Sequence, residues 1–104
     1  MPTSEEETLA HLTDLRLLET VMNQGLKPIK YGCIYFHRIR PGMRGSHTLN
    51  YLRKYAITTG QGLVVVDPND LEREDLLLKR YEAEYSGHVP PELITVIVGG
   101  VTND

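Results

Sequence analysis

The side chains best suited to chemistry lie in a glycine-rich loop. Residues 41–47 read Pro-Gly-Met-Arg-Gly-Ser-His and lead into a predicted helix that Ser46 would cap. Free backbone N–H groups at such a helix start, together with Arg44 and Ser46, would hold an oxyanion or phosphate, and His47 would act as general acid or base. The spacing matches neither the phosphate-binding loop of nucleotidases nor the dinucleotide fingerprint. If the chain is an enzyme, we expect phosphoester- or nucleotide-directed chemistry here; otherwise the stretch is an ordinary loop.

The sequence predicts no metal site and no cofactor. Cys33 and His37 would share one face of a strand, but four residues of strand span about 13 Å, too far for both to bind one ion. Asp67 and Glu72, followed by Lys79, have the residue types of a metal-dependent nuclease, yet the last two fall in a predicted helix rather than a strand. We therefore expect a solvated helix face there and a buried structural role for Cys33.

Positive charge is concentrated between residues 27 and 54. This window holds seven lysines and arginines and no aspartate or glutamate, although the whole chain has a formal net charge of −3. An anionic partner is expected to bind such a block. Arginine favours bidentate contacts with carboxylates or phosphates, and tyrosine suits the anchoring of an interface. The residues predicted to make these contacts are Arg38, Arg40, Arg44, Arg53, Lys54, Tyr35 and Tyr51.

The main functional prediction is a small, non-enzymatic interaction or assembly protein. Its basic segment would bind an acidic protein surface or neighbouring copies of itself, since residues 67–84 hold seven acidic residues against three basic ones. Separate positive and negative regions allow copies to stack head to tail. The sequence leaves open whether the two regions instead pair within one chain.

The alternative prediction is nucleic-acid binding through the same residues. The cations would follow a phosphate backbone, and the tyrosines would stack on bases. A salt titration separates the two alternatives, because binding through phosphate contacts weakens steeply as salt rises. No helix-turn-helix, zinc-finger or RNA-recognition signature accompanies the basic segment.

The elements that must position these residues begin with a predicted helix over residues 1–25. Ser4 with Glu7 fits a capping box, leucines recur at helical spacing, and Gly25 provides a stop. Residues 29–40 are rich in β-branched and aromatic side chains and predict the first strand.

The second half of the chain predicts two more helices and two more strands. An alternative to the second helix is a hairpin turned at Gly60, since glycine suits a two-residue turn. The predicted elements are a helix over residues 46–60, an apolar strand over 63–66, a helix from 70 to about 86 and a central strand over 93–98.

The element order is therefore helix-strand-helix-strand-helix-strand. Strands separated by helices predict a small α/β layer structure with a three-stranded parallel sheet and right-handed crossovers; the hairpin would make it a four-stranded α+β sheet. At 104 residues we expect one domain, 1–104, with residues 1–3 and 101–104 mobile.

The composition excludes several classes of protein. It is 40% hydrophobic and 24% charged, which is ordinary for a globular domain rather than a disordered or fibrous chain. The single cysteine excludes an intramolecular disulfide and favours a reducing compartment. No stretch resembles a signal peptide, and the longest apolar runs have the length of a strand rather than of a membrane span. We expect a cytoplasmic protein without a membrane partner.

Overall fold

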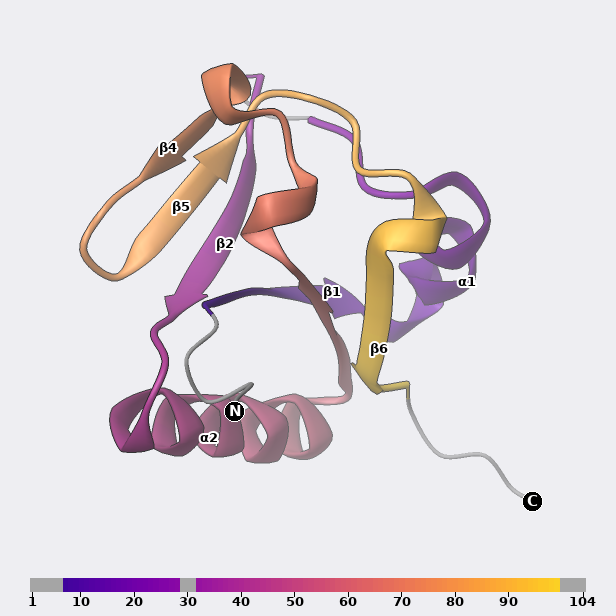
Figure 1. The fold of residues 1–104 in the computed structure, drawn as a ribbon. Coiled ribbons are helices and arrows are strands. Elements are labelled where there is room, and N and C mark those ends of the chain that lie inside the picture. Colours follow the sequence, from indigo (N-terminus) through magenta and orange to yellow (C-terminus); the bar gives the residue numbers. More distant parts are fainter. Residues whose placement is uncertain (1–6, 29–31, 100–104) are drawn as a thin grey trace.

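The computed structural model describes residues 7–28 and 32–99, and in these ranges two α-helices pack on a six-stranded antiparallel sheet (Figure 1). The strand order is β4-β5-β2-β1-β3-β6, so β1 lies inside the sheet and β4 and β6 form its edges. The elements are β1 (Thr8–Asp14), α1 (Leu15–Gln24), β2 (Ile34–Ile39), α2 (Met43–Thr59), β3 (Gln61–Val66), β4 (Leu76–Leu78), β5 (Glu82–Tyr85) and β6 (Ile94–Val98), with 3-10 turns η2 (Pro68–Asp70), η3 (Arg73–Asp75) and η4 (Pro91–Leu93).

The predicted helix-first α/β fold with three parallel strands is wrong. The chain begins with a strand, and every strand pair in the sheet is antiparallel. Parallel pairing is the prediction where a helix links each two strands. Of the two linking helices, the one over 70–86 is replaced by the β4–β5 hairpin, and α2 links β2 to β3, which are separated in the sheet by β1. The four-stranded alternative is wrong as well, because residues 55–59 belong to α2 and Gly60 ends that helix rather than turning a hairpin.

The predicted helix over residues 1–25 is a strand in its middle part. Leu9 and Ala10 in β1 are both fully buried, one in each of the two hydrophobic cores. A strand covered on both faces loses the alternation of apolar and polar residues, and its leucines then continue those of α1 at helical spacing. The helix begins after Asp14, whose carboxylate accepts a hydrogen bond from the Arg16 backbone N–H at 2.9 Å. The predicted cap at Ser4 lies outside the described residues.

The predicted helix from 70 to about 86 is also wrong, since this segment forms two 3-10 turns and the β4–β5 hairpin. Leucines, glutamates and lysines in this segment have good intrinsic helix propensity, but packing overrides it. Ala83 and Tyr85 on β5 are buried in the core, and the hairpin closes through a hydrogen bond from the Lys79 N–H to the Glu82 carbonyl oxygen at 2.8 Å.

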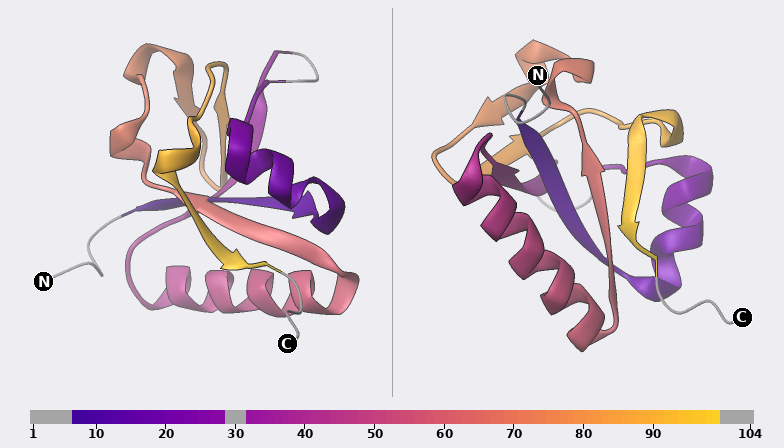
Figure 2. Two further views of the ribbon diagram at one scale, coloured as in Figure 1. Left: turned by 90° about the vertical axis from the view of Figure 1, so that its right-hand side faces the viewer. Right: turned by 60° about the horizontal axis from the view of Figure 1, so that its bottom comes forward.

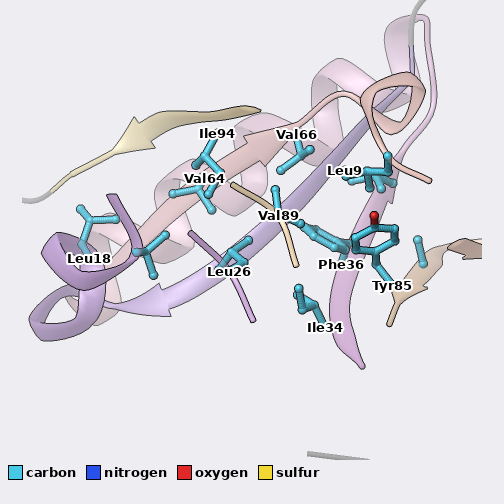
Figure 3. Close-up of a cluster of buried hydrophobic side chains, with 13 residues drawn as sticks. Leu9, Leu18, Leu26, Ile34, Phe36, Val64, Val66, Tyr85, Val89 and Ile94 are labelled. Atoms are coloured by element: carbon cyan, nitrogen blue, oxygen red, sulfur yellow. The ribbon is translucent and has the colours of Figure 1, made fainter. Parts of the chain in front are cut away.

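Both faces of the sheet are covered, each by a separate core. One core lies between the sheet, α1 and the loops after β3 and β5, and its large side chains include Leu9, Phe36, Val64 and Tyr85 (Figure 3). The other lies beneath α2, where Leu52 and Ala56 pack on residues of β1, β2 and β3. The helices α1 and α2 therefore cover opposite faces of the sheet (Figure 2).

The second helix and the strand over 63–66 are confirmed as α2 and β3. The first predicted strand is confirmed as β2 over its second half, whereas residues 29–31 lie outside the described residues, as do the ends 1–3 and 101–104 that were expected to be mobile. The last strand exists but lies at an edge of the sheet, not in its centre. None of the described helices has the length and apolar character needed to cross a bilayer.

Candidate functional site

The helix α2 is held against the sheet by small and apolar residues on one side. Its buried residues are Gly45, Leu52 and Ala56, whose spacings of seven and four place them on one face. A Cβ atom at Gly45 would lie 1.7 Å from the Arg40 carbonyl oxygen, so only glycine lets the helix start this close to the end of β2. Gly60 ends the helix in the left-handed conformation, with φ 71°.

One flank of α2 forms a continuous exposed surface, which we call the α2 stripe. It consists of Arg44, His47, Tyr51, Lys54 and Tyr55, which recur at three- or four-residue spacing and are all exposed. Tyr51 and Tyr55 stack with ring centroids 6.3 Å apart, and 66% and 42% of these residues remain exposed. The stripe thus combines two stacked aromatic rings with flanking cations.

The charge on α2 is not neutralised within the described part of the chain. No aspartate or glutamate occurs between Met43 and Thr59. The ion pairs among the described residues join Arg16 to Asp14, Arg38 to Glu7 and Lys79 to Glu84, so none involves a cation of α2. Arg44 and Lys54 are therefore open to an external anionic group.

Arg38, which was predicted to contact a partner, is engaged inside the fold. Its Nε and Nη2 donate hydrogen bonds to the Glu7 carboxylate, and its Nη1 donates to the Lys79 carbonyl oxygen at 2.7 Å. Its side chain is only 15% exposed. Arg38 joins the start of β1 to the β4–β5 hairpin and leaves little surface for a partner.

The other predicted contact residues do not form one patch. Arg53 lies on the opposite flank of α2 from the stripe, where it lines a hollow with Ile97 and Val98 of β6. Tyr35 projects from β2, and Arg40 is exposed in the link before α2. Of the seven residues, the structure places Arg44, Tyr51 and Lys54 together on the stripe.

The predicted oxyanion loop is largely helix. α2 begins at Met43 rather than at Ser46, and the Ser46 N–H already donates to the Gly42 carbonyl oxygen at 3.1 Å. Gly42 is the residue before the first helical turn, and it supplies no side-chain cap. Ser46 and His47 are exposed on the helix rather than gathered around a pocket, so the geometry supports no catalytic constellation here.

An apolar groove lies between α1 and β2, and the sequence does not predict it because β1, which contributes His11 and Thr13, falls in a predicted helix. It has a volume of about 480 Å³, and His11 is one of the residues that line it. Burial lowers the pKa of His11, partly offset by the hydrogen bond of its Nδ1 with the Tyr35 carbonyl oxygen at 2.8 Å; the charge of nearby His37 lowers it further. Since a carbonyl only accepts, Nδ1 carries the proton. Cys33, expected to be buried, is half-buried in the groove wall with a free thiol.

The acidic turns of residues 67–84 lie away from α2. The turn η3 lies at the top of Figure 1 beside β4 and η2 lies below it, whereas α2 lies at the bottom. The acidic and basic regions still meet elsewhere, because β5 of the acidic region pairs with β2 of the basic segment, with Tyr35 opposite Glu84 and His37 opposite Glu82. Within residues 7–28 and 32–99, no cluster of histidine, cysteine and acidic side chains has the arrangement of a metal site.

Comparison with models of known protein families finds no match for this chain, and no curated protein is detectably similar to it in sequence.

Proposed function

We propose that the chain is a non-enzymatic protein-interaction module that binds an acidic protein surface through the α2 stripe. The observation that carries this proposal is the pair of stacked, exposed tyrosines that share the α2 stripe with Arg44 and Lys54, on a helix without a single acidic residue. Tyrosine and arginine are the side chains most enriched among residues that dominate protein interfaces.

Charge sets the kind of partner. Arg44 and Lys54 form no ion pair with the described residues and would attract a carboxylate-rich surface, and complementary potentials raise the association rate and select the orientation. The positive end of the helix dipole lies near Arg44 and adds to this attraction. Tyr51 and Tyr55 supply apolar area that is already ordered by their stacking, so less side-chain entropy is lost on binding.

A protein partner is favoured over nucleic acid by the small number of cations on the stripe. Tight sequence-independent binding to nucleic acid uses many phosphate contacts, whereas the stripe offers Arg44 and Lys54 with His47 between them. The chain as a whole is negative, which opposes its approach to a polyanion.

The test is site-specific photo-crosslinking in the native cell, with a benzophenone amino acid at position 51. We expect one protein to be captured, through an acid-rich segment, and expect the double reversal Arg44→Glu with Lys54→Glu to abolish the crosslink. The matched control is Arg73→Glu with Arg80→Glu, which makes the same charge change at exposed positions away from α2 and should leave the crosslink intact.

Two outcomes would overturn the proposal. Capture of DNA or RNA at position 51, with binding that weakens steeply as salt rises, would establish nucleic-acid binding instead. A crosslink that survives the reversal on α2 but is lost in the control would place the binding surface elsewhere.

A further inference from the structure

β6 has the composition of a central strand but lies at an edge of the sheet. Residues 93–99 contain no charged side chain and no proline. β6 pairs with β3 on one side only, and among the described residues no backbone hydrogen bond reaches its other side. In the left view of Figure 2, β6 lies in front of the sheet with no described element before it. Its outward N–H and C=O groups form an unprotected pairing edge.

The opposite edge of the sheet, β4, has features that prevent pairing with another chain. β4 contains only three residues. It lies between Asp75 and Lys79, and Lys79 forms an ion pair with Glu84 on the neighbouring strand at 2.7 Å. Short length and flanking charges are the usual means of preventing edge-to-edge association. β6 has neither.

An apolar border continues from β6 onto α2. A hollow of about 260 Å³ lies between the two elements, and its lining includes Ala56, Ile57, Ile97 and Val98. Ile57 is 67% exposed on the flank of α2 that faces this hollow. A strand added to β6 would therefore bring apolar groups of a partner over both the sheet edge and the hollow.

We propose that β6 pairs antiparallel with β6 of a second copy of this chain, giving one sheet that is continuous through both subunits. The occupant of this edge must itself present an apolar, charge-free strand, which β6 of another copy does. Antiparallel pairing about a two-fold axis is self-complementary, and no like charges meet within the strand pair, because residues 93–99 carry none in either subunit. A charged residue of α2, Arg53, lines the hollow beside the strand. An axis perpendicular to the sheet keeps both copies of α2 on one face, so that the flanks carrying Ile57 face each other across the seam.

This dimer does not depend on the proposed function. The α2 stripe lies on the flank of α2 away from β6 and stays accessible in both subunits. Two stripes on one face would let a partner with two acidic sites bind through both, which raises the overall affinity without any new contact. Failure of the dimer leaves the stripe untouched, and failure of the stripe leaves the dimer untouched.

The test is the mass of the full-length chain in solution, measured by sedimentation equilibrium and native mass spectrometry over a range of concentrations. We expect twice the 11.8 kDa of one chain. Thr95→Lys adds a charge at an exposed position of β6 and should return the mass to that of one chain. Leu77→Lys, at an exposed position on β4, is the matched control and should retain the doubled mass.

A second variant separates loss of the dimer from misfolding of β6, which Thr95→Lys alone could cause. Ile57→Lys is exposed and lies on α2, so it changes the seam without changing β6, and it should also shift the mass towards that of one chain. A single-chain mass at all concentrations would overturn the proposal. So would dissociation by Leu77→Lys but not by Thr95→Lys, or a stable complex of β6 with a different protein in place of the dimer.

Discussion

Arg38 of β2 forms an ion pair with Glu7, the residue before β1, and the two side chains are only 15% and 22% exposed. The same guanidinium also holds the Lys79 carbonyl oxygen of the β4–β5 hairpin. One side chain thus joins three segments that are far apart in sequence.

Replacing this arginine is expected to destabilise the fold. Arg38→Ala would leave the Glu7 carboxylate without its partner and should lower the free energy of unfolding by about 1–3 kcal/mol. Amide exchange in the hairpin should accelerate as well, because the Lys79 carbonyl loses its hydrogen bond. Urea unfolding measures the first effect. Arg40→Ala, at an exposed position two residues further along, should change stability by less than about 0.5 kcal/mol; equal losses in both variants would contradict the role of the ion pair.

Gly45→Ala tests the close approach of α2 to the end of β2. Helix propensity alone predicts a gain of about 1 kcal/mol from this change. The added Cβ would lie 1.7 Å from the Arg40 carbonyl oxygen, so we expect instead a loss of about 1–3 kcal/mol as the helix start moves away. Thermal unfolding decides the sign, with Ser46→Ala as the control, because Ser46 is exposed and its Ala variant gains only propensity. A more stable Gly45→Ala variant would show that the contact relaxes without cost.

The Asp14 carboxyl should titrate at unusually low pH. Hydrogen bonds from the Arg16 side chain and backbone lower its pKa from 3.8 to about 2. A carboxyl whose pKa is lower in the folded state stabilises that state at pH values above 3.8, and this contribution disappears as the pH falls from about 4 to about 2. NMR titration of the carboxyl carbon measures the midpoint. Arg16→Met should move it back towards 3.8, and an unchanged midpoint in that variant would refute the assignment to Arg16.

His11 should make the fold less stable in mildly acidic solution. Its pKa is lowered from 6.5 mainly by burial, so the unfolded chain binds more protons than the folded one just below pH 6.5. The free energy of unfolding should therefore fall as the pH drops from 6.5 through the pKa of the folded state. Urea unfolding as a function of pH measures this slope. His11→Gln should reduce it, whereas an identical slope would mean that another group is responsible.

The parts of the fold that could be predicted are those whose signals are local. The helical spacing from Leu49 to Ala56 and the stop at Gly60 suffice to identify α2, and the same spacing groups Arg44, Tyr51 and Lys54 on one stripe. β1 could not be recognised, because burial on both faces removes the alternation that identifies a strand.

Contacts between residues far apart in the sequence explain why the sequence does not predict that Arg38 is engaged inside the fold. Nothing near Arg38 in the sequence indicates that its partner is Glu7, 31 residues earlier. A basic side chain that pairs internally and one that stays exposed look the same in a sequence, and only the tertiary fold separates Arg38 from Arg44.

The place of β1 inside the sheet also governs the order in which the molecule can fold during synthesis. β1 leaves the ribosome before the two strands that flank it, β2 and β3, and the last edge of the sheet comes from β6, at the other end of the described chain. The apolar side chains of β1 stay exposed to solvent until the strands on both sides of it have been translated. Structure with local contacts can form earlier, in α1 and α2, whereas the sheet can be completed only after β6 has been translated.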